Sequence, residues 1–308
     1  MDIYRFIKLS FLIKSPRLKF LGLFILHITK QRYLALHFDP VNACNLRCKM
    51  CYFSDKDYVK KLKGVFPVDV LDYFGNAFFK RAIKLQIGCG TEPTLYKNID
   101  KIIEKASQAK VPHISMVTNG LLLEKEKVKK WIVNGLSEII LSLHGVEKET
   151  YETMMSRGNF KRFLEVLQFI SVLKQGHTFK FRINYTFNQD NFKELRLFYS
   201  RFGKFKPDYL QIRPIINMGN TEYKNFSFLN ILPIYNEVYY QLIRESKKHG
   251  VKLLMHSIKQ LESRKSIHSI INMCIVIFLQ LNNLMIAFYG RMSPIMSTLK
   301  GFVWVGKF

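Results

Sequence analysis

Three cysteines, Cys44, Cys48 and Cys51, lie within eight positions in the stretch "NACNLRCKMCYF" (42–53). A structural zinc site normally has four protein ligands, and a disulfide joins cysteines in pairs. Three thiolates suit an iron–sulfur cluster, because four cysteines close a [4Fe–4S] cube whereas three leave one iron open to another molecule. A zinc site with His37 or Cys89 as the fourth ligand is the alternative.

Composition limits the class of protein. The 308 residues are 48% hydrophobic, enough for one large α/β barrel or two modest domains. Beyond the cluster the chain has only Cys89 and Cys274, which is not the pattern of a secreted disulfide framework, so a reducing cytoplasm is expected. The net charge of +25 is compatible with nucleic acid, an anionic membrane surface or an acidic substrate. No RNA-binding signature accompanies it, which favours a solvated basic surface.

Both ends of the chain differ from the middle. Residues 1–31 are predicted to form a basic amphipathic helical segment, packed on the domain in preference to lying on a membrane. The segment 261–308 is an atypical hydrophobic and basic tail with no Asp or Glu from residue 263 onward. Its apolar run 270–290 could span a bilayer, but amide side chains interrupt it. We expect a helix packed on the barrel, with a truncated or altered C-terminal region as the alternative.

The middle of the chain alternates between two patterns. Short β-rich runs occupy 32–38, 83–88, 112–118, 138–143, 179–187 and 208–215. Helix-like segments occupy 67–82, 97–109, 124–134, 148–175, 190–202 and 232–248. This alternation predicts an α/β fold, a partial (β/α)6 TIM-type barrel with parallel strands over 32–260, including the helix that follows the sixth strand.

Polar and glycine residues follow the predicted strands. The cysteine loop follows the first strand, "GCGTEP" (88–93) the second, "TNG" (118–120) the third and "SLHG" (142–145) the fourth. Chemistry in parallel barrels lies at the carboxyl ends of the strands. We therefore predict one site at this rim, with His144, Asn184 and Arg213 as candidates for substrate contact.

The C-x₃-C-x₂-C spacing followed by Tyr52 and Phe53 resembles the radical S-adenosylmethionine (SAM) superfamily. The resemblance covers about 33–215 and is to the SPASM-associated type, although no cysteine-rich C-terminal extension is recognisable. It implies two cofactors: a [4Fe–4S] cluster held by the three cysteines, and SAM.

The resemblance also implies SAM contacts. "GCGTEP" is similar to the family's Gly-Gly-Glu-Pro stretch, with Thr91 in place of the second glycine, so Gly90, Thr91 and Glu92 are expected near the amino group of SAM. The other implied contacts are Ser142 and Arg157 for the ribose and the carboxylate, and Tyr52 and Ile212 for the adenine.

The implied function is that of a radical SAM enzyme. The reduced cluster cleaves SAM to a 5′-deoxyadenosyl radical, which abstracts hydrogen from a peptide, protein or small-molecule substrate. A reductase or a flavodoxin- or ferredoxin-type protein would donate the electron. The alternatives are a radical SAM enzyme that modifies tRNA and a non-catalytic metal-binding or membrane-associated relative, with peripheral membrane contact compatible with the basic ends.

Overall fold

The computed structural model describes residues 15–215, 220–258, 275–280 and 283–287. Its centre is one curved sheet of nine strands in the order β7-β6-β5-β4-β3-β2-β1-β8-β9. All neighbours are parallel except β8 and β9. The strands are β1 (Leu34–Phe38), β2 (Ala82–Ile87), β3 (Ile114–Thr118), β4 (Glu138–Leu143), β5 (Lys180–Phe187), β6 (Tyr209–Pro214), β7 (Lys252–Leu254), β8 (Ile275–Gln280) and β9 (Asn283–Ala287).

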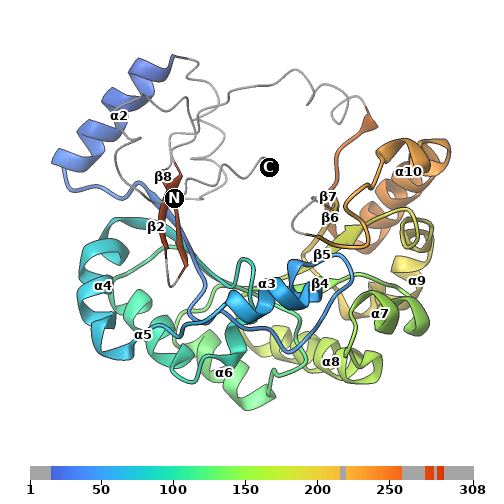
Figure 1. Cartoon of the computed structure of the whole chain (residues 1–308), viewed down its shortest axis with the longest axis horizontal. Helices are drawn as coiled ribbons and strands as arrows, with labels where there is room; N and C mark the ends of the chain where they lie inside the picture. The colour runs from blue at the N-terminus through green and yellow to red at the C-terminus, as the bar shows by residue number, and fades with distance from the viewer. Residues whose placement is uncertain (1–14, 216–219, 259–274, 281–282, 288–308) are drawn as a thin grey trace.

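Most of the helices lie along the outer side of this curved sheet (Figure 1). The helices are α2 (Pro16–Ile28), α3 (Lys56–Lys61), α4 (Leu71–Phe78), α5 (Ile99–Gln108), α6 (Lys125–Val133), α7 (Lys148–Met154), α8 (Phe160–Gly176), α9 (Phe198–Phe202) and α10 (Leu232–His249). The predicted partial barrel is therefore confirmed, with the short β7 as an additional parallel strand.

The two faces of each strand differ in chemistry. In β2, Leu85 and Ile87 are fully buried in the main hydrophobic core, whereas Lys84 and Gln86 alternate with them and are only partly buried. Because successive side chains of a strand point to opposite faces, the apolar set packs against the helices and the polar set faces the barrel interior. Parallel strands that are apolar on both faces would leave no polar interior.

Two predicted helices are interrupted. The segment 148–175 forms α7 and α8, separated by a loop in which Arg157 adopts a left-handed φ of 71°. The side chain of Asn159 then caps α8 by accepting from the backbone N–H of Arg162 at 2.8 Å. The segment 190–202 is a 3₁₀ helix, Phe192–Leu197, followed by α9. The sequence "SRGN" (156–159) contains the turn and cap residues that mark this break.

The helix predicted within 270–290 is wrong where the structure describes this segment. β8 pairs parallel to β1, and β9 pairs antiparallel to β8. The physical reason is that two short apolar runs, the first rich in β-branched residues, flank an Asn-Asn pair, a pattern typical of a hairpin. The remaining tail residues, 259–274, 281–282 and 288–308, lie outside the described residues.

Within the predicted N-terminal segment, Pro16–Ile28 forms α2, while residues 1–14 lie outside the described residues. The side chain of Ser15 accepts from the backbone N–H of Leu18, and Pro16 occupies the first turn. Several apolar side chains of α2 are exposed, for example Phe20 at 71% and Phe24 at 53%. Over the described residues, no helix has the length and apolar character required to cross a membrane.

Arg32, just before β1, fixes the amino-terminal end of the barrel. Its guanidinium donates to the carbonyl oxygens of Phe79 at 2.8 Å, Ala82 at 3.0 Å and Ala109 at 2.5 Å. One side chain thus joins the segment before β1, the start of β2 and the end of α5. The planar fork of arginine suits this multiple contact better than a lysine ammonium does.

Replacing Arg32 with Ala is expected to lower the free energy of unfolding by about 2 kcal/mol or more, because three carbonyl groups lose a charged donor. The free energy of unfolding of Arg32→Lys should lie between those of Arg32→Ala and the wild type. Urea unfolding followed by circular dichroism measures the difference. The control is Arg244→Ala on the exposed side of α10, which should stay within about 0.5 kcal/mol of the wild type. Equal stability of Arg32→Ala and the wild type would contradict this role.

Candidate functional site

The cysteine loop follows β1 at the carboxyl end of the sheet. Its backbone is folded tightly, since the N–H of Cys51 donates to the carbonyl of Cys48 at 2.9 Å. Arg47 stabilises the loop from within by donating to the carbonyl oxygens of Cys44 and Leu46, both at 2.7 Å. The hydroxyl of Ser54 donates to the carbonyl of Cys51 at 2.7 Å. These hydrogen bonds define the conformation of the loop.

The three thiols are close enough to influence one another and are only partly exposed. Burial raises the pKa of Cys44 to about 12, and it also raises the pKa of Cys48 and Cys51. For Cys48, the charges of Cys51 and Cys44 raise the pKa further. The free thiols are therefore protonated at neutral pH, and a metal centre that binds them must displace these protons.

No group of three His, Cys, Asp or Glu side chains in the described part of the chain is arranged to hold a single metal ion. Zinc requires its four ligands to converge on one atom. The separate irons of a cube instead hold their thiolates further apart.

A second contact attaches the cysteine loop to the loop between α7 and α8. The backbone N–H groups of Arg47 and Lys49 donate to the carbonyls of Ser156 at 3.0 Å and Met154 at 2.9 Å. Arg157 is thus adjacent in sequence to a residue that contacts the cysteine loop. Its side chain is exposed, and the structure shows no ion pair for it within the described residues.

Asp39, the first residue after β1, holds the second predicted loop in place. Its carboxylate is 3% exposed and accepts from the backbone N–H groups of Cys89 at 2.7 Å and Gly90 at 3.1 Å, and from the hydroxyl of Thr91 at 2.9 Å. Asp39 is not among the site residues predicted from the sequence. Its signal was available, because an acid directly after the first strand belongs at the same rim as the other polar residues.

The carboxylate of Glu92 is also engaged within the protein. It is 2% exposed and accepts from the hydroxyls of Thr94 at 2.6 Å and Thr118 at 2.7 Å, and from the backbone N–H of Asn119 at 2.8 Å. These bonds join the loop after β2 to the end of β3. With both oxygens occupied, the side chain positions the loop, and the backbone of residues 89–91 is left at the rim.

Tyr52 joins the cysteine loop to Gly90. Its hydroxyl donates to the carbonyl of Gly90 at 2.6 Å. A Cβ atom at position 90 would lie 2.5 Å from that hydroxyl oxygen, so a larger residue there would require the end of the Tyr52 side chain to move and its hydrogen bond to break. The structure thus brings together Tyr52, Gly90, Thr91 and Glu92 beside the cysteine loop.

The other predicted contacts are distributed over both faces of the sheet. Ser142 is partly buried and pairs in register with Asn184 on the interior face. Ile212 is 2% exposed and belongs to the main core on the helix-covered face, so its side chain does not line the interior. The alternation with Gln211 and Arg213 explains this, because neighbouring residues of a strand face opposite ways.

Two buried polar atoms near this rim have no hydrogen-bond partner in the described chain, Nδ1 of His144 and Oδ1 of Asn184. Burial, followed by the charge of Arg213, lowers the pKa of His144 to about 4. Buried polar groups are nearly always satisfied, so unpaired ones at a rim are consistent with a missing ligand.

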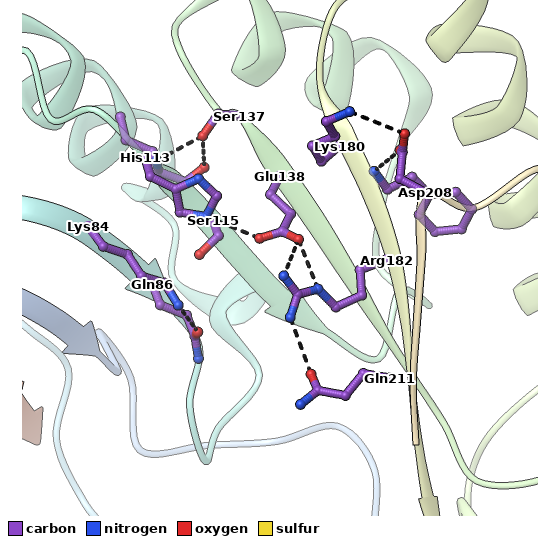
Figure 2. Close-up of polar contacts among 12 residues, drawn as sticks. Lys84, Gln86, His113, Ser115, Ser137, Glu138, Lys180, Arg182, Asp208 and Gln211 are labelled. Atoms are coloured by element: carbon purple, nitrogen blue, oxygen red, sulfur yellow. Dashed lines mark hydrogen bonds and ion pairs between the residues drawn. The ribbon is translucent and has the colours of Figure 1, made fainter. Parts of the chain in front are cut away.

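A polar network crosses the deeper interior (Figure 2). Arg182 on β5 donates to Oε1 of Glu138 on β4, with Nη2 at 2.6 Å and Nε at 2.8 Å. Nε2 of His113 lies 3.1 Å from the second oxygen of Glu138, and Nη1 of Arg182 donates to Oε1 of Gln211 at 3.2 Å. Burial alone would raise the pKa of Glu138, but the hydrogen bond with His113 and the charge of Arg182 lower it overall.

Comparison with known proteins identifies the class that this fold and rim define. The model of the radical SAM superfamily matches residues 39–190, which contain the cysteine loop, the loop after β2 and the ends of β3 and β4. The chain belongs to the radical SAM superfamily. The match confirms the predicted membership. Members of this superfamily use a [4Fe–4S] cluster and SAM.

Curated relatives are more specific in name but distant in sequence. The GTP 3′,8-cyclase of Aquifex aeolicus is 28% identical over 176 residues, which cover 54% of this chain and 53% of that protein. A probable GTP 3′,8-cyclase of Saccharolobus solfataricus is 26% identical over 205 residues, covering 66% and 64%. The chain thus spans about half to two thirds of the length of these relatives.

Solved structures share the fold. SuiB of Streptococcus suis bound to the precursor peptide SuiA has a TM-score of 0.62 at 17% identity, covering 80% of this chain and 58% of that one. The structure of anSMEcpe with bound AdoMet has a TM-score of 0.59 at 18% identity, covering 72% and 61%.

The residues of this chain fit the superfamily's cofactors. Three thiols without a convergent fourth ligand suit a cluster with an open iron. The unpaired buried atoms of His144 and Asn184 leave polar side-chain groups available at the same rim.

Gly90→Ala is expected to destabilise the protein by about 1 kcal/mol, because the new methyl group displaces the hydroxyl of Tyr52 and breaks its hydrogen bond to the carbonyl of residue 90. Adding Tyr52→Phe should recover part of that loss, since it removes the colliding atom. A double-mutant cycle in urea therefore gives a favourable coupling energy.

Gly176→Ala is the matched control, because nothing lies within 4 Å of the position its Cβ would take. It should change stability by less than about 1 kcal/mol. Strict additivity of Gly90→Ala and Tyr52→Phe would contradict the contact.

Stability should also depend on Glu138 at acid pH. Its pKa is lowered in the folded protein, so its contribution is present above the ordinary value of 4.5 and is lost as the pH falls through the folded pKa. The wild type is therefore expected to lose stability below about pH 4.5, and Glu138→Gln to show a shallower loss over the same range. Urea unfolding between pH 6 and pH 3 measures both slopes.

Glu126→Gln, at an exposed position of α6 with no ion pair among the described residues, is the control and should keep the wild-type slope. Identical slopes for Glu138→Gln and the wild type would mean that another acid determines this pH dependence.

Proposed function

We propose that this protein is a radical SAM enzyme in which Cys44, Cys48 and Cys51 bind three irons of a [4Fe–4S] cluster. The observation that supports the proposal best is the attachment of the cysteine loop to the glycine loop after β2. Tyr52 bonds to Gly90, and Asp39 bonds to residues 89–91, so the two loops are fixed against each other at the carboxyl ends of β1 and β2. When bound, the cluster and SAM supply a reductive cleavage that yields methionine and a 5′-deoxyadenosyl radical.

The residues of the chain contribute positioning and shielding. Asp39 and Glu92 hold the loop after β2 so that the backbone at Gly90 and Thr91 is presented to the amino group of SAM. Tyr52 limits the space beside the adenine. Ser142 lies on the interior face for a ribose contact, and Arg157 would serve the carboxylate through its charged fork. Ile212 offers only its backbone, because its side chain is in the core.

The proposed substrate is a peptide or a small molecule. The solved structure of SuiB with a precursor peptide supports the first class, and the similarity to GTP 3′,8-cyclases supports the second. The electron would come from a reductase or a flavodoxin- or ferredoxin-type protein, for which dithionite substitutes in vitro.

An RNA substrate is a second candidate, favoured by the net charge of +25. RNA that copurifies with the protein and is released by salt would support it. RNA-free protein at low salt would count against it.

Cys48→Ala is expected to abolish SAM cleavage. Anaerobically reconstituted wild type with dithionite and SAM should form 5′-deoxyadenosine, measured by liquid chromatography, and the variant should form less than about a hundredth as much because one iron loses its ligand.

Cys89→Ser is the matched control. Its thiol lies at the rim but outside the proposed ligand set, so iron content and cleavage should persist. Loss of metal in both variants, with zinc present on purification, would indicate the four-ligand zinc site. A loaded wild type that never cleaves SAM would overturn the proposed function.

A further inference from the structure

The barrel interior contains more positive than negative charge. Among the cationic side chains on the interior face are Lys84 on β2, Arg182 on β5 and Arg213 on β6. Register and alternation place each on the interior face, and Figure 2 shows Lys84 and Arg182 pointing into the same space as Glu138.

The acidic side chains Glu138, Asp39 and Glu92 already have hydrogen-bond or ion-pair partners within the protein. Glu138 bonds to both Arg182 and His113. Asp39 and Glu92 accept from loop donors, as described above, and are almost fully buried. Of Lys84, Arg182 and Arg213, only Arg182 therefore has a carboxylate partner within the described residues.

Lys84 has no carboxylate partner in the described part of the chain. Its ammonium donates to Oε1 of Gln86 at 3.0 Å, and no ion pair joins it to an acid. Burial lowers its pKa most strongly, Glu138 acts in the opposite direction, and Arg182 lowers the pKa further. An ammonium held inside a barrel by a neutral amide is costly unless an anion approaches it.

Arg213 extends the same excess of charge toward the rim. No ion pair involves it among the residues that the structure describes. Its side chain is exposed at the rim, and partial desolvation, followed by the charge of the neighbouring Arg182, lowers its pKa. Its charge also acts on His144, one of the residues with an unpaired buried nitrogen. The charge of Arg182 thus lowers the pKa of both Lys84 and Arg213.

We propose that Lys84 and Arg213 form an anion-binding site in the barrel interior, which holds a phosphate or carboxylate group of the substrate. The inference rests on the proposed function, since it assigns this anion to the molecule that is brought to the rim. An anionic group that contacts these side chains supplies the missing counter-charge. The amide of Gln211, which the bond to Arg182 holds in orientation, adds a neutral donor.

The test is direct binding of two simple anions to the full chain by isothermal titration calorimetry. Pyrophosphate probes the phosphate class and citrate the carboxylate class, both at low ionic strength. Wild type is expected to bind at least one of them. Lys84→Met and Arg213→Met should each weaken that binding by tenfold or more. Preference for one anion assigns the class.

The matched controls are Lys129→Met on α6 and Arg244→Met on α10, which remove the same charges from exposed positions. They should bind within about twofold of wild type. Equal weakening by control and interior variants would show binding to the basic surface as a whole and would overturn the site. No wild-type binding of either anion would overturn it too.

Folding is checked with a second kind of variant. Gln86→Glu places a carboxylate beside Lys84 and should compete with the anion, so it is expected to lower affinity while keeping or raising the melting temperature. Lys84→Met should also melt no lower than wild type, since it removes an uncompensated buried charge.

These measurements separate the two proposals because anion binding needs no SAM cleavage. A protein that cleaves SAM but binds anions equally in wild type and Lys84→Met retains the proposed function and loses the anion site. A protein that shows the expected binding pattern but never cleaves SAM retains the site for anions and loses the enzymatic assignment.

Discussion

The carboxylate of Asp39 is the interaction on which the site depends. It lies at the end of β1 and accepts from Cys89, Gly90 and Thr91 after β2, so it sets the distance between the two loops that meet at the rim. Burial of a carboxylate is unfavourable unless donors compensate for it, and three donors do so here. The buried carboxylate of Glu92 joins β2 to β3 in the same way, by accepting hydrogen bonds from Thr118 and Asn119 at the end of β3. Two buried acids therefore align three strand ends.

The division of the sheet into an apolar outer face and a polar interior explains what the sequence predicted well. Near-continuous strands and periodic helices gave the partial barrel, because burial against helices requires the leucines and isoleucines that make such runs visible. The cysteine spacing was equally direct, since one tight loop must supply three ligands. Tyr52 and Gly90 were also visible as motif residues, and the structure joins them by a hydrogen bond.

Other features could not be read from the chain because they depend on which side of a strand a residue faces or on partners far away. Ile212 was expected beside adenine, but a shift of one position along β6 puts its side chain in the core. Asp39 acts through residues 50 or more positions away. Lys84 and Gln86 belong to no sequence motif. Only the curvature of the sheet places them opposite Glu138 and Arg182 (Figure 2). The tail hairpin was missed because Asn282 and Asn283 were interpreted as interruptions of one long apolar helix, whereas β8 ends at Gln280 and β9 begins at Asn283.

The pairing of β8 with β1 has a consequence for biosynthesis. β1 is among the first strands to leave the ribosome, yet its outer neighbour is encoded some 240 positions later, as the register of Leu34 with Ile275 shows. Until then, one side of β1 is an unpaired edge next to the cysteine loop, and such edges invite association with other chains. Contacts so distant in sequence also form slowly. The growing chain therefore carries an unpaired strand edge at β1 for most of the time it takes to be made.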